Sequence, residues 1–186
     1  MKLAAVLYEM GEGAATDALL GSFALRLKRA GFKLAGAVQW NAPVANRSRC
    51  GITLEDLASG RRIAASDDRG SLAKGCRLDH SALEDSVGIA LSSLGSETDL
   101  VVINRFGKHE AVGHGFRPMI EQAVLLGVPV LVGLNRAHLG SWRAFVGEEP
   151  ELLAPELEAV SSWCAAIVSD RGADVGLEER APVALA

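Results

Sequence analysis

Four short apolar segments place the strongest constraint on the fold. Residues 3–8, 32–40, 100–103 and 128–132 are largely apolar and do not alternate between apolar and polar side chains. Uninterrupted apolar runs of this length are typical of strands that are buried on both faces, as in parallel sheets covered by helices. The sequence therefore predicts a three-layer α/β fold with a mostly parallel sheet.

The spacing of apolar residues predicts helices between these strands. Leu19, Leu20, Phe23 and Leu27 recur at intervals of one to four residues that keep them on one helical face. They predict a helix over residues 16–30, which joins the first two strands into a right-handed βαβ unit. Similar patterns predict helices over 78–94, 116–126, 138–145 and 155–168.

The middle of the chain departs from this alternation. Residues 52–57 and 61–65 flank a turn at Ser59-Gly60 and favour an antiparallel hairpin inserted in the α/β scheme. The chain has 186 residues, of which 49% are hydrophobic and 23% are charged, which is ordinary for one globular domain. We expect a single domain over 1–168 and a loose tail over 169–186, where no periodicity is found.

Charge and composition exclude several classes of function. The net charge is −4, and 5% of residues are aromatic, so a general nucleic-acid binder is not expected. Cys50, Cys76 and Cys164 form no CxxC pair, which favours a reducing, cytoplasmic setting. No apolar run approaches the length of a membrane span, so membrane insertion is not expected either. The sequence leaves the oligomeric state open, a homo-oligomer included.

The first candidate site is the loop after the strand at 3–8. Ligands of open parallel sheets bind beyond the carboxyl ends of the strands. Gly11 and Gly13 allow a close backbone approach, and the following helix start offers free N–H groups to an anion; Glu9 and Thr16 flank this segment. The patterns G-x-x-x-x-G-K-[ST] and G-x-G-x-x-G are both absent. The alternative is a flexible turn followed by a Thr16 cap.

The second candidate site is a basic turn expected after the strand at 100–103. In nucleotide hydrolases the end of such a strand carries acids that hold magnesium and prime water. Here Asn104 and Arg105 occupy those places. Arg105 and Lys108 are able to bind an oxyanion directly, while Phe106 is expected in the core. The alternative is a solvated loop with surface charges.

A third candidate is Arg77, which directly precedes the helix predicted over 78–94 and is expected to face the same cleft. Its neighbour Cys76 is interpreted as a small core residue, with a thiol of lowered pKa as the alternative. Asp79 or Ser81 is expected to cap the helix. The arginines around the hairpin are interpreted as an exposed face rather than a lid over an anion.

No catalytic or metal-binding set emerges from the spacing of the remaining polar residues. His109 and His114 are one residue too far apart for H-E-x-x-H, and Gly113 interrupts the helix that such a motif requires. No Ser–His–Asp or Cys–His set is assembled either. We therefore expect no catalytic residue, no metal ligand and no cofactor.

Several stretches together resemble the bacterial domain-of-unknown-function 2478 family. They are residues 4–9, 18–20, 54–63, 75–79, 104–110 and 142–145. The resemblance covers the chain up to about Trp163. That family has no established activity, and its members are often encoded near molybdate transport functions, which implies a link to molybdenum handling.

More distantly, the chain resembles P-loop nucleoside triphosphatases of the small thermophile type. Residues 103–108 resemble their strand that ends in Asp-Glu before an Ile-Gly-Lys-like run, with both acids replaced. The resemblance implies a P-loop-like sheet whose cleft has lost magnesium ligation and the acid that orients water.

These observations favour a binding protein over an enzyme. We expect non-hydrolytic binding of a small oxyanion or phosphorylated ligand, with molybdate, tungstate and a nucleotide as candidates. The expected ligand-binding residues are Glu9, Gly11, Gly13, Thr16, Arg77, Asn104, Arg105 and Lys108. One alternative is an atypical nucleoside triphosphatase in which Glu9, Glu12 or Glu110 replaces the missing acids. Another is a regulatory protein-interaction module.

Overall fold

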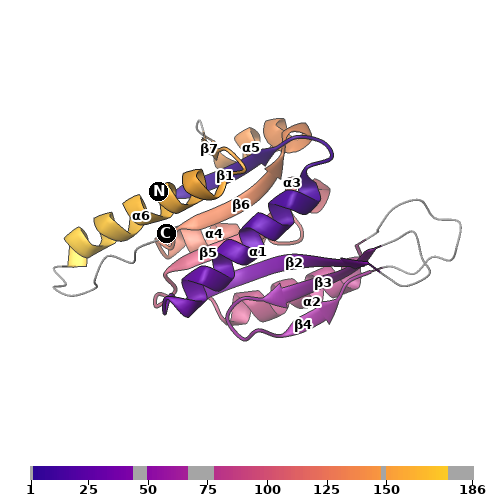
Figure 1. Ribbon diagram of the computed structural model, residues 1–186, viewed down its shortest axis with the longest axis horizontal. Helices are drawn as coiled ribbons and strands as arrows, with labels where there is room; N and C mark the ends of the chain where they lie inside the picture. The colour runs from indigo at the N-terminus through magenta and orange to yellow at the C-terminus, as the bar shows by residue number, and fades with distance from the viewer. Residues whose placement is uncertain (1, 44–49, 67–77, 148–149, 176–186) are drawn as a thin grey trace, which may run out of the picture.

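A mixed sheet between two layers of helices forms the computed structural model, which describes residues 2–43, 50–66, 78–147 and 150–175 (Figure 1). Its elements in chain order are β1 (Leu3–Tyr8), α1 (Gly13–Arg29), β2 (Leu34–Pro43), β3 (Cys50–Asp56), β4 (Arg62–Ala64), α2 (His80–Ser92), β5 (Leu100–Phe106), α3 (Lys108–Ala111), α4 (Arg117–Leu125), β6 (Val130–Asn135), the 3₁₀ turn η1 (Arg136–His138), α5 (Leu139–Val146), β7 (Glu151–Leu153) and α6 (Leu157–Val175). The predicted α/β fold is confirmed.

The strand order within the described residues is β4-β3-β2-β5-β6-β1-β7. Strands β2, β5, β6, β1 and β7 are parallel to one another. Strand β3 runs antiparallel to both β2 and β4, so the predicted hairpin is present and forms one edge of the sheet. The mostly parallel sheet with an inserted hairpin is thereby confirmed.

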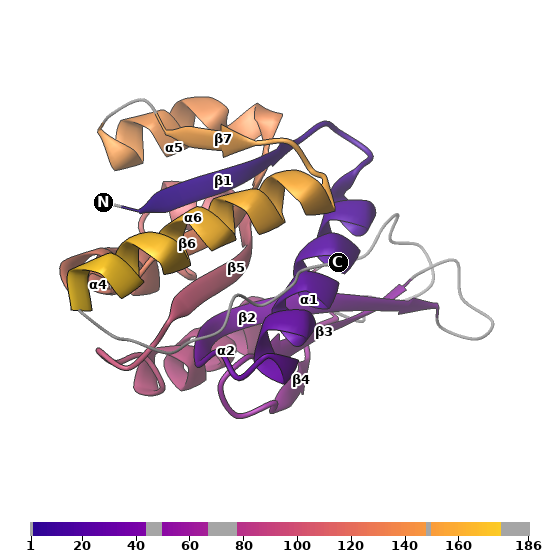
Figure 2. The same ribbon diagram turned by 60° about the vertical axis from the view of Figure 1, so that its left-hand side comes forward.

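Helices cover both faces of the sheet. Leu20 and Phe23 of α1 and Trp163 of α6 belong to one apolar cluster, and Figure 2 shows these two helices across the same face. A second cluster on the opposite face contains residues of α2, α4 and α5, including Ile120 and Trp142. Coverage on both sides explains why the central strands are apolar at nearly every position.

The end of β5 differs from the sequence-based expectation. Residues 104–106 continue the strand where a turn was predicted, and the pairing with β6 is irregular between Ile103 and Phe106. Phe106 is 1% exposed and packs edge-on against Trp142 at a ring-centroid distance of 5.0 Å, which confirms it as a core residue. The buried aromatic side chain therefore keeps this polar-looking segment within the sheet.

Three further differences concern element boundaries. Helix α6 was predicted to end at residue 168 but continues to Val175, so 169–175 are helical and 176–186 lie outside the described residues. Strand β7 and helix α3 were not predicted because three and four residues are too few to show a periodicity. None of the described helices has the length and apolar character needed to cross a membrane.

Candidate functional site

An open pocket of about 320 Å³ lies at the carboxyl ends of three neighbouring parallel strands. It is lined by Tyr8, Gly11, Gly13, Arg105, Phe106, Gly107, Asn135 and His138. These residues come from the ends of β1, β5 and β6, the segments that follow β1 and β5, the start of α1, and η1. Ligands of open parallel sheets bind beyond the carboxyl ends of the strands, which is where this pocket lies.

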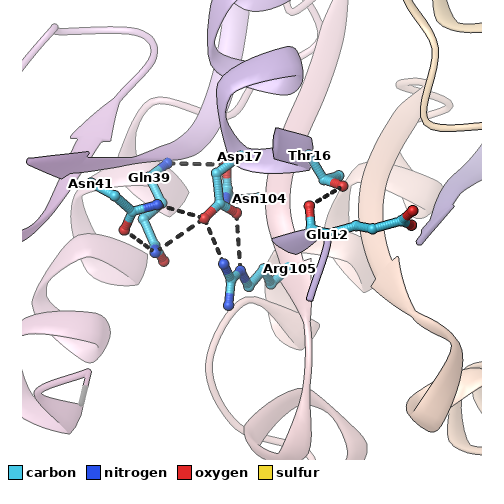
Figure 3. Close-up of polar contacts among 7 residues, drawn as sticks. All are labelled: Glu12, Thr16, Asp17, Gln39, Asn41, Asn104 and Arg105. Atoms are coloured by element: carbon cyan, nitrogen blue, oxygen red, sulfur yellow. Dashed lines mark hydrogen bonds and ion pairs between the residues drawn. The ribbon is translucent and has the colours of Figure 1, made fainter. Parts of the chain in front are cut away.

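A buried carboxylate organises the polar residues behind this pocket. Asp17, in the second turn of α1, is 2% exposed. Its Oδ1 accepts hydrogen bonds from Asn104 Nδ2 (2.5 Å) and Arg105 Nε (3.0 Å), and its Oδ2 accepts one from Arg105 Nη2 (2.5 Å). Two further amides, Asn41 Nδ2 (2.8 Å) and Gln39 Nε2 (3.3 Å), donate to Oδ2 (Figure 3). The carboxylate thus accepts five hydrogen bonds.

Asn104 serves as a connector within this cluster. Its Nδ2 donates to Asp17, while its Oδ1 accepts from the backbone N–H of Gln39 at 3.1 Å. The side chain is 5% exposed and joins β5 to α1 and β2. Both ends of the amide are therefore engaged inside the protein.

Arg105 lies between Asp17 and the start of α1. Its side chain is 43% exposed, and its Nη2 lies 3.1 Å from the position that a Cβ on Gly13 would occupy. Burial lowers the pKa of the guanidinium. The hydrogen bonds to Asp17 and the negative charge of Asp17 raise it by more, so the net shift of the pKa is upward. Arg105 is consequently a permanent cation held against the glycine loop.

Tyr8 forms another wall of the pocket. Burial raises the pKa of its phenol; the charge of Arg105 lowers it and that of Asp17 raises it, with a net upward shift. The hydroxyl therefore stays protonated at neutral pH and is able to donate a hydrogen bond.

Helix α1 begins earlier than the sequence suggested. Its first residue is Gly13, with Glu12 in the N-cap position, so the alternative in which Thr16 caps the helix is wrong. Thr16 is instead 1% exposed, and its hydroxyl donates to the Glu12 carbonyl oxygen at 3.1 Å. The early start is compatible with two small residues, Ala14 and Ala15, in the first turn, and it brings the helix N-terminus to the pocket.

The other predicted site residues have different surroundings. Glu9 is exposed and forms an ion pair with Arg136. Lys108 is exposed on α3 and is not among the described residues that line the pocket. Arg77 and its neighbour Cys76 lie outside the described residues. The structure thus brings together Gly11, Gly13 and Arg105 around one space.

Two acids named as alternatives for catalysis are engaged in local structure. Glu110 is 5% exposed and accepts hydrogen bonds from the backbone N–H groups of Gly107 (2.8 Å) and Phe116 (3.1 Å). Glu12 accepts one from the backbone N–H of Glu9 at 2.8 Å, and Figure 3 shows its carboxylate pointing away from the Asp17 cluster. Within the described part of the chain, no three His, Cys, Asp or Glu residues are placed to hold a metal ion.

Comparison with known proteins identifies the family. The model of a family described as "Protein of unknown function (DUF2478)" matches residues 3–163. The chain belongs to the DUF2478 family. The matched region spans all the described elements from β1 into α6, including the pocket and the Asp17 cluster.

Two known proteins are similar to this DUF2478 chain. It is 34% identical over 162 residues to the molybdenum import ATP-binding protein ModC 2 of Bradyrhizobium diazoefficiens. The matched region covers 87% of this chain but only 18% of the length of ModC 2. The crystal structure of THEP1 from Aquifex aeolicus superimposes with a TM-score of 0.57, at 16% identity, over 91% of this chain and 98% of that one. The second likeness establishes that this chain and THEP1 have similar folds.

Asp17 is the central site residue that the sequence-based reasoning missed. A signal for it exists: Asp17 lies three positions before Leu20 and seven before Ala24, both of which are fully buried. An acid on the apolar face of a helix needs a cation or several donors nearby. The partner, Arg105, lies 88 positions further along the chain and is found only from the folded structure.

Proposed function

We propose that this DUF2478 protein binds a small oxyanion, or the phosphate of a phosphorylated ligand, in the pocket beyond β1, β5 and β6, and does not hydrolyse it. One observation carries the proposal: the Arg105 guanidinium lies against Gly13, the first residue of a 17-residue helix. A helix N-terminus and a guanidinium both favour a negatively charged ligand, so the two features reinforce each other.

Each wall of the pocket has a role in this proposal. The N–H groups of the first turn of α1 and the Arg105 guanidinium bind the anionic oxygens. The protonated Tyr8 hydroxyl supplies a further donor. Gly11, with φ +98° and no atom within 4 Å of the place that a Cβ would occupy, leaves the entrance open. A volume of about 320 Å³ suits a small ligand.

The placement of charge supports binding over hydrolysis. P-loop enzymes have a lysine near the start of the first helix and an acid at the end of a strand, where it holds magnesium. In this chain the helix contributes the acid, Asp17, and the strand contributes the cation, Arg105. Because Asp17 accepts five hydrogen bonds inside the protein, its lone pairs are not directed at a metal ion or a water molecule.

The ligand candidates are molybdate, tungstate, phosphate and a nucleotide. Molybdate and tungstate are included because ModC 2 is named as a molybdenum import protein, although the chain matches only 18% of its length. The shared chemistry is a tetrahedral oxyanion or phosphate group, which the donors around the pocket suit without distinguishing the four.

Isothermal titration calorimetry with molybdate, tungstate, phosphate and ATP tests the proposal. At least one should bind the parent chain and bind Arg105→Lys more weakly, because lysine cannot make the paired contact with Asp17 that orients the guanidinium. Arg29→Lys is the matched control, since Arg29 is exposed at the other end of α1, about 25 Å along the helix axis. An absence of heat with all four compounds refutes the proposal.

Hydrolysis is tested separately. The purified parent chain, incubated with ATP and magnesium, should release no inorganic phosphate above the level of a buffer control. Magnesium-dependent release that Glu9→Gln abolishes would instead establish the atypical nucleoside triphosphatase.

A further inference from the structure

We infer that Asp17 is a positioning residue of the anion site, which fixes the Arg105 side chain in the place where it meets the ligand. The inference rests on the proposed function. Asp17 is 2% exposed and is not among the described residues that line the pocket, so it acts through Arg105 and not by touching the ligand.

The contact between the two side chains fixes the plane of the guanidinium. Nε and Nη2 of Arg105 bind the two carboxylate oxygens of Asp17 at 3.0 Å and 2.5 Å. This side-on, paired geometry is the most orienting contact that arginine makes. It directs Nη2 along Gly13 and leaves Nη1 without a hydrogen-bond partner among the residues that the structure describes.

Asp17 is itself fixed from the sheet. Amide groups of Asn104 on β5 and of Gln39 and Asn41 on β2 donate to its carboxylate. Gln39 Nε2 also donates to Asn41 Oδ1 at 2.8 Å, which couples the two amides of β2. The orientation of Arg105 is therefore set by two strands and a helix together.

Two effects of Asp17 on anion affinity oppose each other. As a negative charge it weakens the attraction between Arg105 and an anion, so its removal would tighten binding if charge alone mattered. As an anchor it keeps Arg105 out of the many staggered rotamers that a free arginine side chain adopts. If about one tenth of those rotamers face the pocket, loss of the anchor weakens the apparent affinity about tenfold.

We expect the anchoring effect to dominate in Asp17→Asn. The side-chain amide of the new asparagine would point N–H donors at the N–H donors of Arg105, Asn41 or Asn104. The guanidinium would therefore lose its anchor and would also be pushed out of its place. Affinity for inorganic phosphate should fall about tenfold. The control Asp85→Asn removes the same charge from an exposed position on α2, which packs on the opposite face of the sheet, and should leave the affinity unchanged.

A double-mutant cycle separates positioning from a general structural effect. Asp17→Asn and Arg105→Lys should each weaken phosphate binding about tenfold, and the double variant should be no weaker than either one, because both remove the same paired contact. A hundredfold loss in the double variant, or tighter binding by Asp17→Asn alone, would overturn the inference.

A second measurement does not depend on any ligand. The proton on Arg105 Nε, followed by NMR, should exchange slowly with water in the parent chain and rapidly in Asp17→Asn. If Asp17→Asn does not fold, Asn41→Ala takes its place, and this proton should exchange faster in Asn41→Ala than in the parent chain. Rapid exchange in the parent chain contradicts the inference. If all four titrations fail while the Arg105 Nε–H exchanges slowly, the proposed function and the anion site are refuted, and only the anchoring of Arg105 by Asp17 stands.

Discussion

Replacement of Arg105 by methionine should destabilise the fold, because it leaves Asp17 as a buried charge without its cation. Methionine keeps much of the aliphatic length and removes the guanidinium. The carboxylate, 2% exposed, then retains three of its five hydrogen bonds, those from Asn104, Asn41 and Gln39. The free energy of unfolding is therefore expected to fall. The size of this decrease follows from how deeply Asp17 and Arg105 are buried.

Removal of one partner of a fully buried ion pair costs about 3–5 kcal/mol. Arg105 is 43% exposed, so solvent already screens part of the attraction, and the three amides still solvate the carboxylate. Both facts place the expected loss at about 2–3 kcal/mol. For a chain of 186 residues this corresponds to a fall in Tm of roughly 5–10 °C.

Urea unfolding followed by circular dichroism at neutral pH measures this loss. Arg29→Met, at the exposed end of α1, is the control and should change the free energy of unfolding by less than about 0.5 kcal/mol. Addition of Asp17→Asn to Arg105→Met should recover part of the stability, because it removes the unpaired charge. If Arg105→Met unfolds within about 0.5 kcal/mol of the parent chain, the Asp17–Arg105 pair does not contribute as argued.

Three further predictions concern the scaffold. Gly36→Ala should lose more than about 4 kcal/mol in urea unfolding, because φ is +102° and the new Cβ would lie 2.1 Å from the Val102 carbonyl oxygen, whereas Gly60→Ala, with φ +74° and open space, should lose only about 1–2 kcal/mol. Asp79→Ala should lower stability by about 1 kcal/mol in thermal unfolding, since its carboxylate caps α2 through the backbone N–H of Ser81 at 2.8 Å. Burial raises the pKa of Cys164 from 9.0 to about 11, so the stability due to the neutral thiol is complete below pH 9.0 and is lost as the pH rises to about 11. That loss is about 2–3 kcal/mol, and it should appear as the amount by which the pH-dependent loss in urea unfolding of the parent chain exceeds that of Cys164→Ala, because Tyr8, whose pKa is also raised, contributes equally to both.

Much of the fold was predictable because burial on both faces leaves a plain mark on a strand. Residues 100–103 are fully apolar, and helices do cover both sides of β5. The end of the same strand was misassigned because Asn104 and Arg105 look like loop residues. Asn104 is buried at 5% exposure only because Asp17 and the backbone of Gln39 satisfy its amide. Sequence patterns assign polar residues to the surface unless their partners are known.

That the predicted residues bind a ligand stays a prediction, and the structure shows only which of them lie close together. The glycine loop and Arg105 were expected at the carboxyl edge of the sheet, and the structure places Gly11, Gly13 and Arg105 around one pocket. Closeness in sequence groups Lys108 with Arg105, yet β5 ends at Phe106 and Lys108 begins α3. The polar network around Asp17 joins α1, β2 and β5, so its members become neighbours only through the topology.

The Asp17–Arg105 pair, with the acid on the helix and the cation on the strand, also predicts how magnesium affects anion binding. In P-loop enzymes the metal ion bridges the phosphates to a hydroxyl of the first helix and an acid at the strand end. Here the strand end presents Asn104 and Arg105, and Glu9, at the end of β1, is paired with Arg136. A divalent cation near the proposed anion site would meet the guanidinium of Arg105, which repels it.

Magnesium should therefore change the affinity for inorganic phosphate by less than about twofold, as measured by calorimetry with the metal and with a chelator. An increase of about tenfold, some 1.4 kcal/mol, would mean that carboxylates do recruit the metal ion to the pocket. Glu9→Gln would then identify the acid, because it removes the carboxylate that lies next to Tyr8 in the chain and leaves the Asp17–Arg105 pair intact. Such a result would favour the nucleoside triphosphatase over the binding protein, since it would restore the metal ligation that the strand end lacks.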